Sequence, residues 1–258
     1  MKSLKRLAVA TAAVACLAGA MPAAATLLFD RGLPSINLND VAGASRSNVS
    51  WGSSTADLFT GDDFMIGVTG QKYLINSLTV WGAQVDPLSD DLDNIALYLG
   101  KSGSALSLMA AGSITGNVNS NSNISHVPGF YPTTAIEYQG WGGGIYSVMQ
   151  TTFSGLNLQI DGGVLYNFGV WGDNISWYSH ASNKLLSGTP QEGADNKFKE
   201  FDLNDLSSVT VFDSNGNGWD KSSDINVQVD GSQIPEPTSL ALVGLALAGL
   251  GFSRRKTA

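Results

Sequence analysis

The chain has 258 residues, of which 43% are hydrophobic and 14% are charged, and its formal net charge is −8. Without the two terminal segments described below, the body at residues 26–233 carries 8 Lys and Arg against 21 Asp and Glu, a net charge of −13. Such an acidic surface repels nucleic acid and anionic lipid headgroups, so we expect neither as a partner. The body is rich in Gly, Ser and Asn, which is typical of strands and turns rather than of helices.

The first 25 residues have the pattern of a secretory signal peptide. Three basic residues precede an apolar stretch at 7–20, and Ala23-Ala24-Ala25 provides small residues for cleavage. We therefore assign residues 1–25 to a helical signal peptide that is removed on export. Lipidation of Cys16 is the alternative. Cleavage would remove the only cysteine of the chain, so no disulfide would stabilise the exported protein.

Residues 26–233 are predicted to form one all-β domain. Apolar and polar residues alternate at Leu74–Trp81, Leu156–Ile160 and Val164–Val170, a period typical of strands, and the body shows no helical period. Gly162-Gly163 between the last two runs predicts a tight hairpin. This pattern predicts a single β-sandwich or jelly-roll-like ectodomain. Further strands are expected near Thr26–Phe29, Asp63–Ile66, Ile95–Leu99, Val209–Val211 and Ile225–Val229.

Aromatic residues in two predicted loops are candidates for binding a ligand. Tyr138 and Trp141 lie in a long polar segment at 113–144, and Trp177 and Tyr178 follow the strand that ends near Val170. Flat rings stack on sugar faces, and neighbouring Asn, Asp and Gln side chains can bond sugar hydroxyls. The alternative is that these rings fill or cap the sandwich.

One segment has the spacing of a calcium-binding loop, with oxygen-bearing residues at positions one, three and five, Gly218 at six and a carboxylate at twelve. It ends in Asp rather than the longer bidentate Glu, and its flanks read as strands, so a Gly/Asn-rich turn is the alternative. Calcium is the one cofactor that the sequence suggests. The candidate ligands are the side chains of Asp213, Asn215, Asn217 and Asp224 and the carbonyl of Trp219.

Residue patterns of known catalytic sites are missing from the sequence. His126 and His180 lie in polar, loop-like surroundings and are interpreted as surface histidines. Asp62-Asp63 is interpreted as part of a solvated turn, and no carboxylate spacing indicates the facing pair that glycoside hydrolysis needs. The sequence contains no nucleophile elbow and no phosphate-binding loop. We therefore expect a protein that is not an enzyme.

Residues 234–258 combine three physically different pieces. Pro235-Glu236-Pro237 is stiff and extended because proline fixes φ. An apolar run of 13 residues at 240–252 follows, and Arg254-Arg255-Lys256 forms a basic end. We expect the run to form a hydrophobic helix in the inner membrane with its basic end in the cytoplasm. A permanent span needs about 20 apolar residues, so this short run favours a transient anchor.

This tail resembles the PEP-CTERM sorting signal of exported proteins in Gram-negative bacteria that make exopolysaccharide. The resemblance implies that an exosortase, a membrane-embedded cysteine transpeptidase, recognises Pro235-Glu236-Pro237. The enzyme would cut near this motif and discard the helix with its basic end. The resemblance also implies a membrane-anchored precursor that becomes a cell-surface or extracellular protein. An ordinary anchor that is never cut is the alternative.

Together these features predict an exported, non-catalytic protein that binds or scaffolds exopolysaccharide or biofilm material. Two alternatives remain open. One is a secreted hydrolase that acts on polysaccharide, and the other is a purely structural surface protein without a ligand.

Overall fold

The computed structural model describes residues 25–32, 47–49, 57–84, 92–115, 118–119, 121–128, 137–139, 145–172, 177–182, 192–212, 223–235 and 244. Within these ranges sixteen strands form two antiparallel sheets, which confirms the predicted all-β sandwich. None of the described residues belongs to a helix with the length and hydropathy needed to cross a membrane. The predicted signal peptide helix and the apolar run at 240–252, apart from Gly244, lie outside the described residues.

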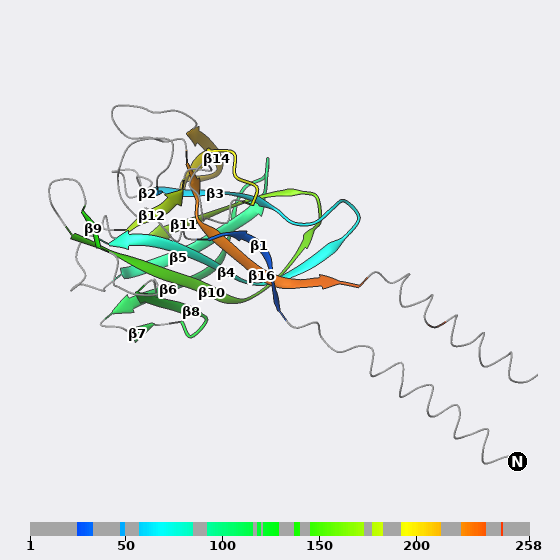
Figure 1. Ribbon diagram of the computed structural model, residues 1–258, viewed down its shortest axis with the longest axis horizontal. Helices are drawn as coiled ribbons and strands as arrows, with labels where there is room; N and C mark the ends of the chain where they lie inside the picture. Colours follow the sequence, from blue (N-terminus) through cyan, green and yellow to red (C-terminus); the bar gives the residue numbers. More distant parts are fainter. Residues whose placement is uncertain are drawn as a thin grey trace, which may run out of the picture.

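The larger sheet has nine strands, and Figure 1 shows that its longest strands lie side by side across the body. Its central order is β1 (Thr26–Arg31), β16 (Val227–Ile234), β4 (Lys72–Gln84), β10 (Ile145–Asp161) and β8 (Ile124–Pro128). Four shorter strands extend it: β9 (Glu137–Gln139) on β10, β12 (Trp177–Ser182) on β4, and both β2 (Ser47–Val49) and β15 (Asp224–Ile225) on β12.

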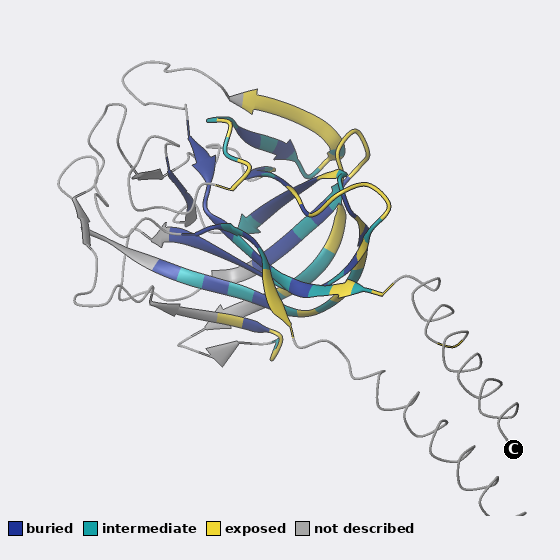
Figure 2. Cartoon of the chain, turned by 45° about the vertical axis from the view of Figure 1, so that its right-hand side comes forward, coloured by how far each residue is buried: buried dark blue, intermediate teal, exposed yellow. Residues whose placement is uncertain are grey.

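The smaller sheet has seven strands in one continuous order. They are β14 (Asp205–Phe212), β13 (Phe198–Asp202), β3 (Leu58–Met65), β11 (Leu165–Gly172), β5 (Leu92–Lys101), β6 (Ser107–Thr115) and β7 (Val118–Asn119). Buried residues gather on the central strands of the body, whereas β14 is exposed along most of its length (Figure 2).

The main core lies between the two sheets because strands of both contribute to one cluster of buried side chains. Leu78 and Phe153 come from the nine-stranded sheet, and Leu97 and Phe168 come from the seven-stranded sheet; all four are 0% exposed. Full burial of such a side chain stabilises the fold by about 1.5–3 kcal/mol. The core is therefore the main source of stability, as expected for a body that contains no cysteine.

Several predicted strands are confirmed, but the predicted hairpin at Gly162-Gly163 is wrong. β10 and β11 follow one another across this turn, yet they belong to different sheets. The amides of Gly162 and Gly163 donate to the carbonyls of Gln71 (2.8 Å) and Ile66 (2.9 Å). These acceptors lie in the turn between β3 and β4, which also crosses between the sheets. Gly163 has φ 69°, a conformation that glycine adopts readily. This conformation suits a turn within one sheet and a turn between two sheets alike.

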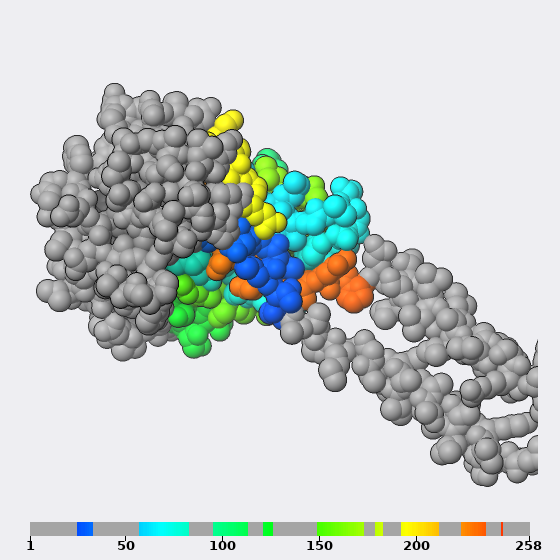
Figure 3. Space-filling view, viewed as in Figure 1, coloured from blue at the N-terminus to red at the C-terminus, as the bar shows by residue number. Residues whose placement is uncertain are grey.

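The first and last strands of the body are neighbours. β1 pairs with β16 in antiparallel fashion, so that Thr26 lies opposite Gly231 and Arg31 lies opposite Val227. Figure 3 shows the blue surface of β1 beside the orange surface of β16. The chain therefore enters and leaves the body at the same end.

Candidate functional site

The sorting motif begins where the sheet ends. β16 runs between β1 and β4, and its last residue, Ile234, lies opposite Lys72 of β4. Pro235 follows directly and is exposed. Because proline has no amide hydrogen to donate to a ladder, the strand stops at this point. Other predicted sorting residues lie outside the described ranges: Glu236, Pro237, Arg254, Arg255 and Lys256.

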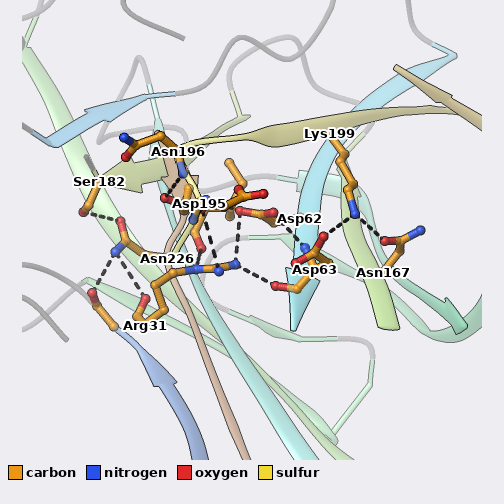
Figure 4. A network of polar contacts seen from close by, with 12 residues as sticks. Arg31, Asp62, Asp63, Asn167, Ser182, Asp195, Asn196, Lys199 and Asn226 are labelled. Carbon is orange, nitrogen blue, oxygen red and sulfur yellow. Dashed lines mark hydrogen bonds and ion pairs between the residues drawn. The ribbon is translucent and has the colours of Figure 1, made fainter. Parts of the chain in front are cut away.

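A second chemically distinctive region is a buried charge cluster between the sheets, made of Arg31, Asp62 and Asp224 (Figure 4). Nη2 of Arg31 lies 3.1 Å from Oδ2 of Asp62, and Nη1 lies 3.9 Å from Oδ1 of Asp224. All three side chains are only 1% exposed. The guanidinium also donates from Nε to the carbonyl of Ile225 at 3.0 Å and from Nη2 to that of Asp63 at 2.8 Å.

Backbone amides hold both carboxylates of this cluster. Asp62 Oδ2 accepts the amide of Ile225 at 2.7 Å, and the two oxygens of Asp224 accept the amides of Asp195 and Asn196 at 2.9 Å each. Burial raises the pKa of Asp62 well above its usual range; the Arg31 charge opposes this shift and the Asp224 charge adds to it. Burial likewise raises the pKa of Asp224, against Arg31 and the two amides. One guanidinium thus lies between two carboxyl groups that both resist ionisation.

The interpretation of Asp62-Asp63 as a solvated turn is wrong. Both residues lie in β3, and Asp62 points into the sandwich toward Arg31 of the opposite sheet. Asp63 is more exposed and forms an ion pair with Lys199. The Nζ of Lys199 also donates to Oδ1 of Asn167 at 2.7 Å. The side chains of Asp62 and Asp63 therefore take part in separate contacts, Asp62 with Arg31 and Asp63 with Lys199.

The interpretation of His180 as a surface histidine is also wrong. His180 lies in β12 and is 0% exposed, with its Nδ1 2.6 Å from Oδ1 of Asn226. The same oxygen accepts the hydroxyl of Ser182 at 2.9 Å, and the amide nitrogen of Asn226 donates to the carbonyls of Arg31 and Gly32. Burial lowers the pKa of His180 to about 4, although the bond to Asn226 opposes this shift. The imidazole is therefore neutral at neutral pH. It links β12 to Asn226, the residue between β15 and β16.

His126 lies in β8 rather than in a loop, and β8 pairs with β10 so that His126 is opposite Thr151. The segment 113–144 was expected to be one long loop, but it contains β7, β8 and β9. Its polar composition concealed these strands, because they are short, with two residues in β7, five in β8 and three in β9.

Among the candidate calcium ligands, the structure describes Asp224 alone, in β15. Its carboxylate faces Arg31 and the amides of the 195–196 turn. In the part of the chain that the structure describes, no three His, Cys, Asp or Glu side chains are grouped as a metal site. Calcium binding stays a prediction. The remaining candidates lie outside the described residues: Asp213, Asn215, Asn217 and Trp219.

Three of the four aromatic candidates lie at one end of the nine-stranded sheet. Residues that lie directly opposite one another on neighbouring strands form a register row. One such row crosses β9, β10, β4 and β12 and consists of Glu137, Ser147, Gln84 and Trp177. Tyr138, opposite Tyr146, belongs to the row on one side, and Tyr178, opposite Ala83, belongs to the row on the other side. Trp141 lies outside the described residues. The sequence did not predict this grouping, because it results from pairing with β4 and β10.

Comparison with known proteins identifies the C-terminal segment. Residues 233–256 match the model of the PEP-CTERM protein-sorting motif. No curated protein and no solved structure matches the chain significantly. The matched range includes Pro235-Glu236-Pro237 and the basic residues 254–256. This motif marks a membrane-anchored precursor that is exported to the cell surface or the extracellular space, with an exosortase as its processing partner. The chain therefore carries a PEP-CTERM protein-sorting motif, which indicates an exported surface protein that an exosortase processes.

Proposed function

We propose that the folded body is a non-catalytic module that binds exopolysaccharide at the end of the nine-stranded sheet where β9 and β12 lie. The observation that carries this proposal is the grouping of Tyr138 and Tyr178, whose register rows are two apart and so belong to the same face of the sheet, with Trp177 in the row between them. Neighbouring strands are about 4.8 Å apart, so the four strands of the central row span about 14 Å. Several sugar rings of one chain can cover that distance.

The chemistry of the remaining polar groups supports a binding role over a catalytic one. His180, Asp62 and Asp224 have the shifted pKa values that are often found at active sites. All three are at most 1% exposed, and each is hydrogen-bonded to other groups of the protein. Their pKa shifts therefore follow from the structural role of a buried polar network.

A co-sedimentation assay tests the proposal. Processed protein from exosortase-positive cells is mixed with exopolysaccharide from the same host, with calcium and with a chelator. We expect the variant Tyr138→Ala/Tyr178→Ala to bind at least about tenfold more weakly, equivalent to about 1.4 kcal/mol of lost stacking. Leu108→Ala is the control, because Leu108 is an exposed apolar side chain (55%) on the other sheet.

Each outcome of this assay has a clear reading. Equal binding by the wild type and the double variant would place the binding surface elsewhere. No retention of the wild type under either condition would contradict glycan binding, and a biofilm defect on deletion would then favour a purely structural role. Release of reducing ends from the polysaccharide would contradict the non-catalytic proposal and favour a hydrolase.

A further inference from the structure

The sorting motif and the last strand of the sheet share residues. The matched motif begins at Gln233, whereas β16 continues to Ile234. Gln233 and Ile234 are paired with Tyr73 and Lys72 of β4. The body is therefore joined to Pro235 without any linker.

β16 has two halves with different support. Residues 227–231 pair with β1 on one side and with β4 on the other, whereas residues 232–234 pair only with β4 within the described chain. Both neighbours bulge beside the boundary: the register skips Leu28 in β1 and Asn76 in β4, close to Asp230. Bulges interrupt a ladder locally, so the regular pairing of residues 227–230 does not continue without a break into residues 232–234.

Burial follows the same division. Val227, Val229 and Gly231 are buried, but Gln233 is exposed and Ser232 and Ile234 are only partly buried. Gly231 lies so close to β4 that an added Cβ would be 2.2 Å from the carbonyl oxygen of Leu74. The tight part of the strand thus ends at Gly231. Segments with few buried contacts and one-sided hydrogen bonding open most easily from a folded protein.

We propose that residues 232–234 form a releasable tether that must detach from β4 before the exosortase can take up the sorting motif. An enzyme cleft that binds Gln233 and Ile234 needs the same backbone groups that β4 occupies. Detachment would add about 10 Å of extended chain between the folded body and Pro235. The half of β16 at 227–231 would remain in the sheet and keep the sandwich intact.

A cross-strand disulfide tests this proposal in the full-length precursor. Ser232→Cys with Leu74→Cys joins two residues that are directly opposite, within the distance that a disulfide spans. The only native cysteine is Cys16, in the predicted signal peptide, and the exported chain enters an oxidising compartment. We expect the oxidised variant to lose processing, measured as persistence of the full-length form in exosortase-positive cells. Thiol labelling of the precursor reports whether the bridge has formed.

The matched control is Ser77→Cys with Asp230→Cys, an opposed pair of the same two strands before the bulge. This bridge leaves residues 232–234 free, so processing should continue. The single variant Ser232→Cys should also be processed. A linker of six Gly and Ser residues between Ile234 and Pro235, about 20 Å when extended, should restore processing of the locked protein.

Normal processing of the locked precursor would overturn the proposal. So would failure of the linker to rescue the locked protein, or loss of processing in the single cysteine variant. If the bridge does not form, hydrogen exchange of the wild-type precursor decides. We expect the amides of residues 232–234 to exchange at least ~10-fold faster than those of 227–231, and equal protection would refute a releasable tether.

Discussion

Two ion pairs of almost equal length lie in opposite surroundings in this protein. Arg31 and Asp62 are 3.1 Å apart and 1% exposed, whereas Lys72 and Asp161 are 3.0 Å apart and 53% exposed. In water the charges of the second pair are screened and their side chains lose entropy on pairing. In the core each charge of the first pair depends on its partner, because burial has removed its water. Burial rather than distance therefore decides how much the loss of each pair changes the free energy of unfolding.

The largest effect is expected from Arg31→Ala. This change leaves Asp62 and Asp224 buried without a cation, and removing one partner of a buried pair costs about 3–5 kcal/mol of the free energy of unfolding. Urea unfolding followed by circular dichroism measures the loss. The double variant Arg31→Met/Asp62→Leu should be less destabilised than Arg31→Ala, because it leaves only Asp224 without its cation, and two backbone amides still donate to that carboxyl group. A loss below about 1 kcal/mol for Arg31→Ala would mean that water reaches the cluster.

The next effect is a pH dependence caused by His180. Its folded pKa of about 4 lies below the unfolded value of 6.5, so the unfolded chain binds the proton first as the pH falls. The stability due to this residue is fully present above about pH 6.5 and is lost as the pH falls to about 4, a change of about 3 kcal/mol.

Unfolding of the wild type and of His180→Gln at neutral pH and at about pH 4.5 checks this prediction. Burial raises the pKa of Asp62, so this carboxyl contributes in the opposite sense: its stabilising effect decreases as the pH rises from about 3.8 through its folded pKa. That contribution is common to both proteins and cancels in their difference. Parallel pH profiles for the two proteins would show that His180 does not titrate in this range.

A smaller loss of stability is expected from Lys199→Met. The burial of the Lys199–Asp63 pair is intermediate between those of the two pairs compared above. The side chains of Lys199 and Asp63 are 10% and 18% exposed, and Lys199 also donates to Asn167. Loss of these bonds should cost about 1–3 kcal/mol, since water can partly rehydrate Asp63. A double-mutant cycle with Asp63→Asn isolates the pair, and additive effects would contradict direct coupling.

The smallest effect is expected from Lys72→Ala on the surface. The loss should be about 0–1 kcal/mol and should shrink further as salt is added. Thermal unfolding at low and high salt measures it. A salt-independent loss would show that the ion pair with Asp161 is not its cause.

The sequence predicted the strands better than it predicted their partners. Leu74–Trp81 and Ile95–Leu99 are strands as expected, because alternation or continuous apolar character is a local property. Whether the turn at Gly162-Gly163 joins paired strands depends on the sheet to which each strand belongs, and local residues do not encode this choice.

The buried polar groups were predicted least well. His180 lies between Ser179 and Ala181 and Asp62 lies between Gly61 and Asp63, and these short polar or small-residue stretches were interpreted as a loop and a turn. Their partners, Asn226 and Arg31, are 46 and 31 residues away, so pairing could not be inferred from spacing. The sorting segment was predicted correctly for the opposite reason, since its proline motif, apolar run and basic end are contiguous.

The pairing of β1 with β16 also has a consequence for the timing of export. Thr26 hydrogen-bonds to Gly231 across 205 residues of chain, and Arg31 bonds to Ile225 across 194. A chain that emerges from the translocation machinery starting at its N-terminus presents its first strand long before that strand's neighbour arrives. Loop-closing contacts of such length form late. The sandwich can close only after residue 231 has crossed, directly ahead of the sorting motif that begins at residue 233.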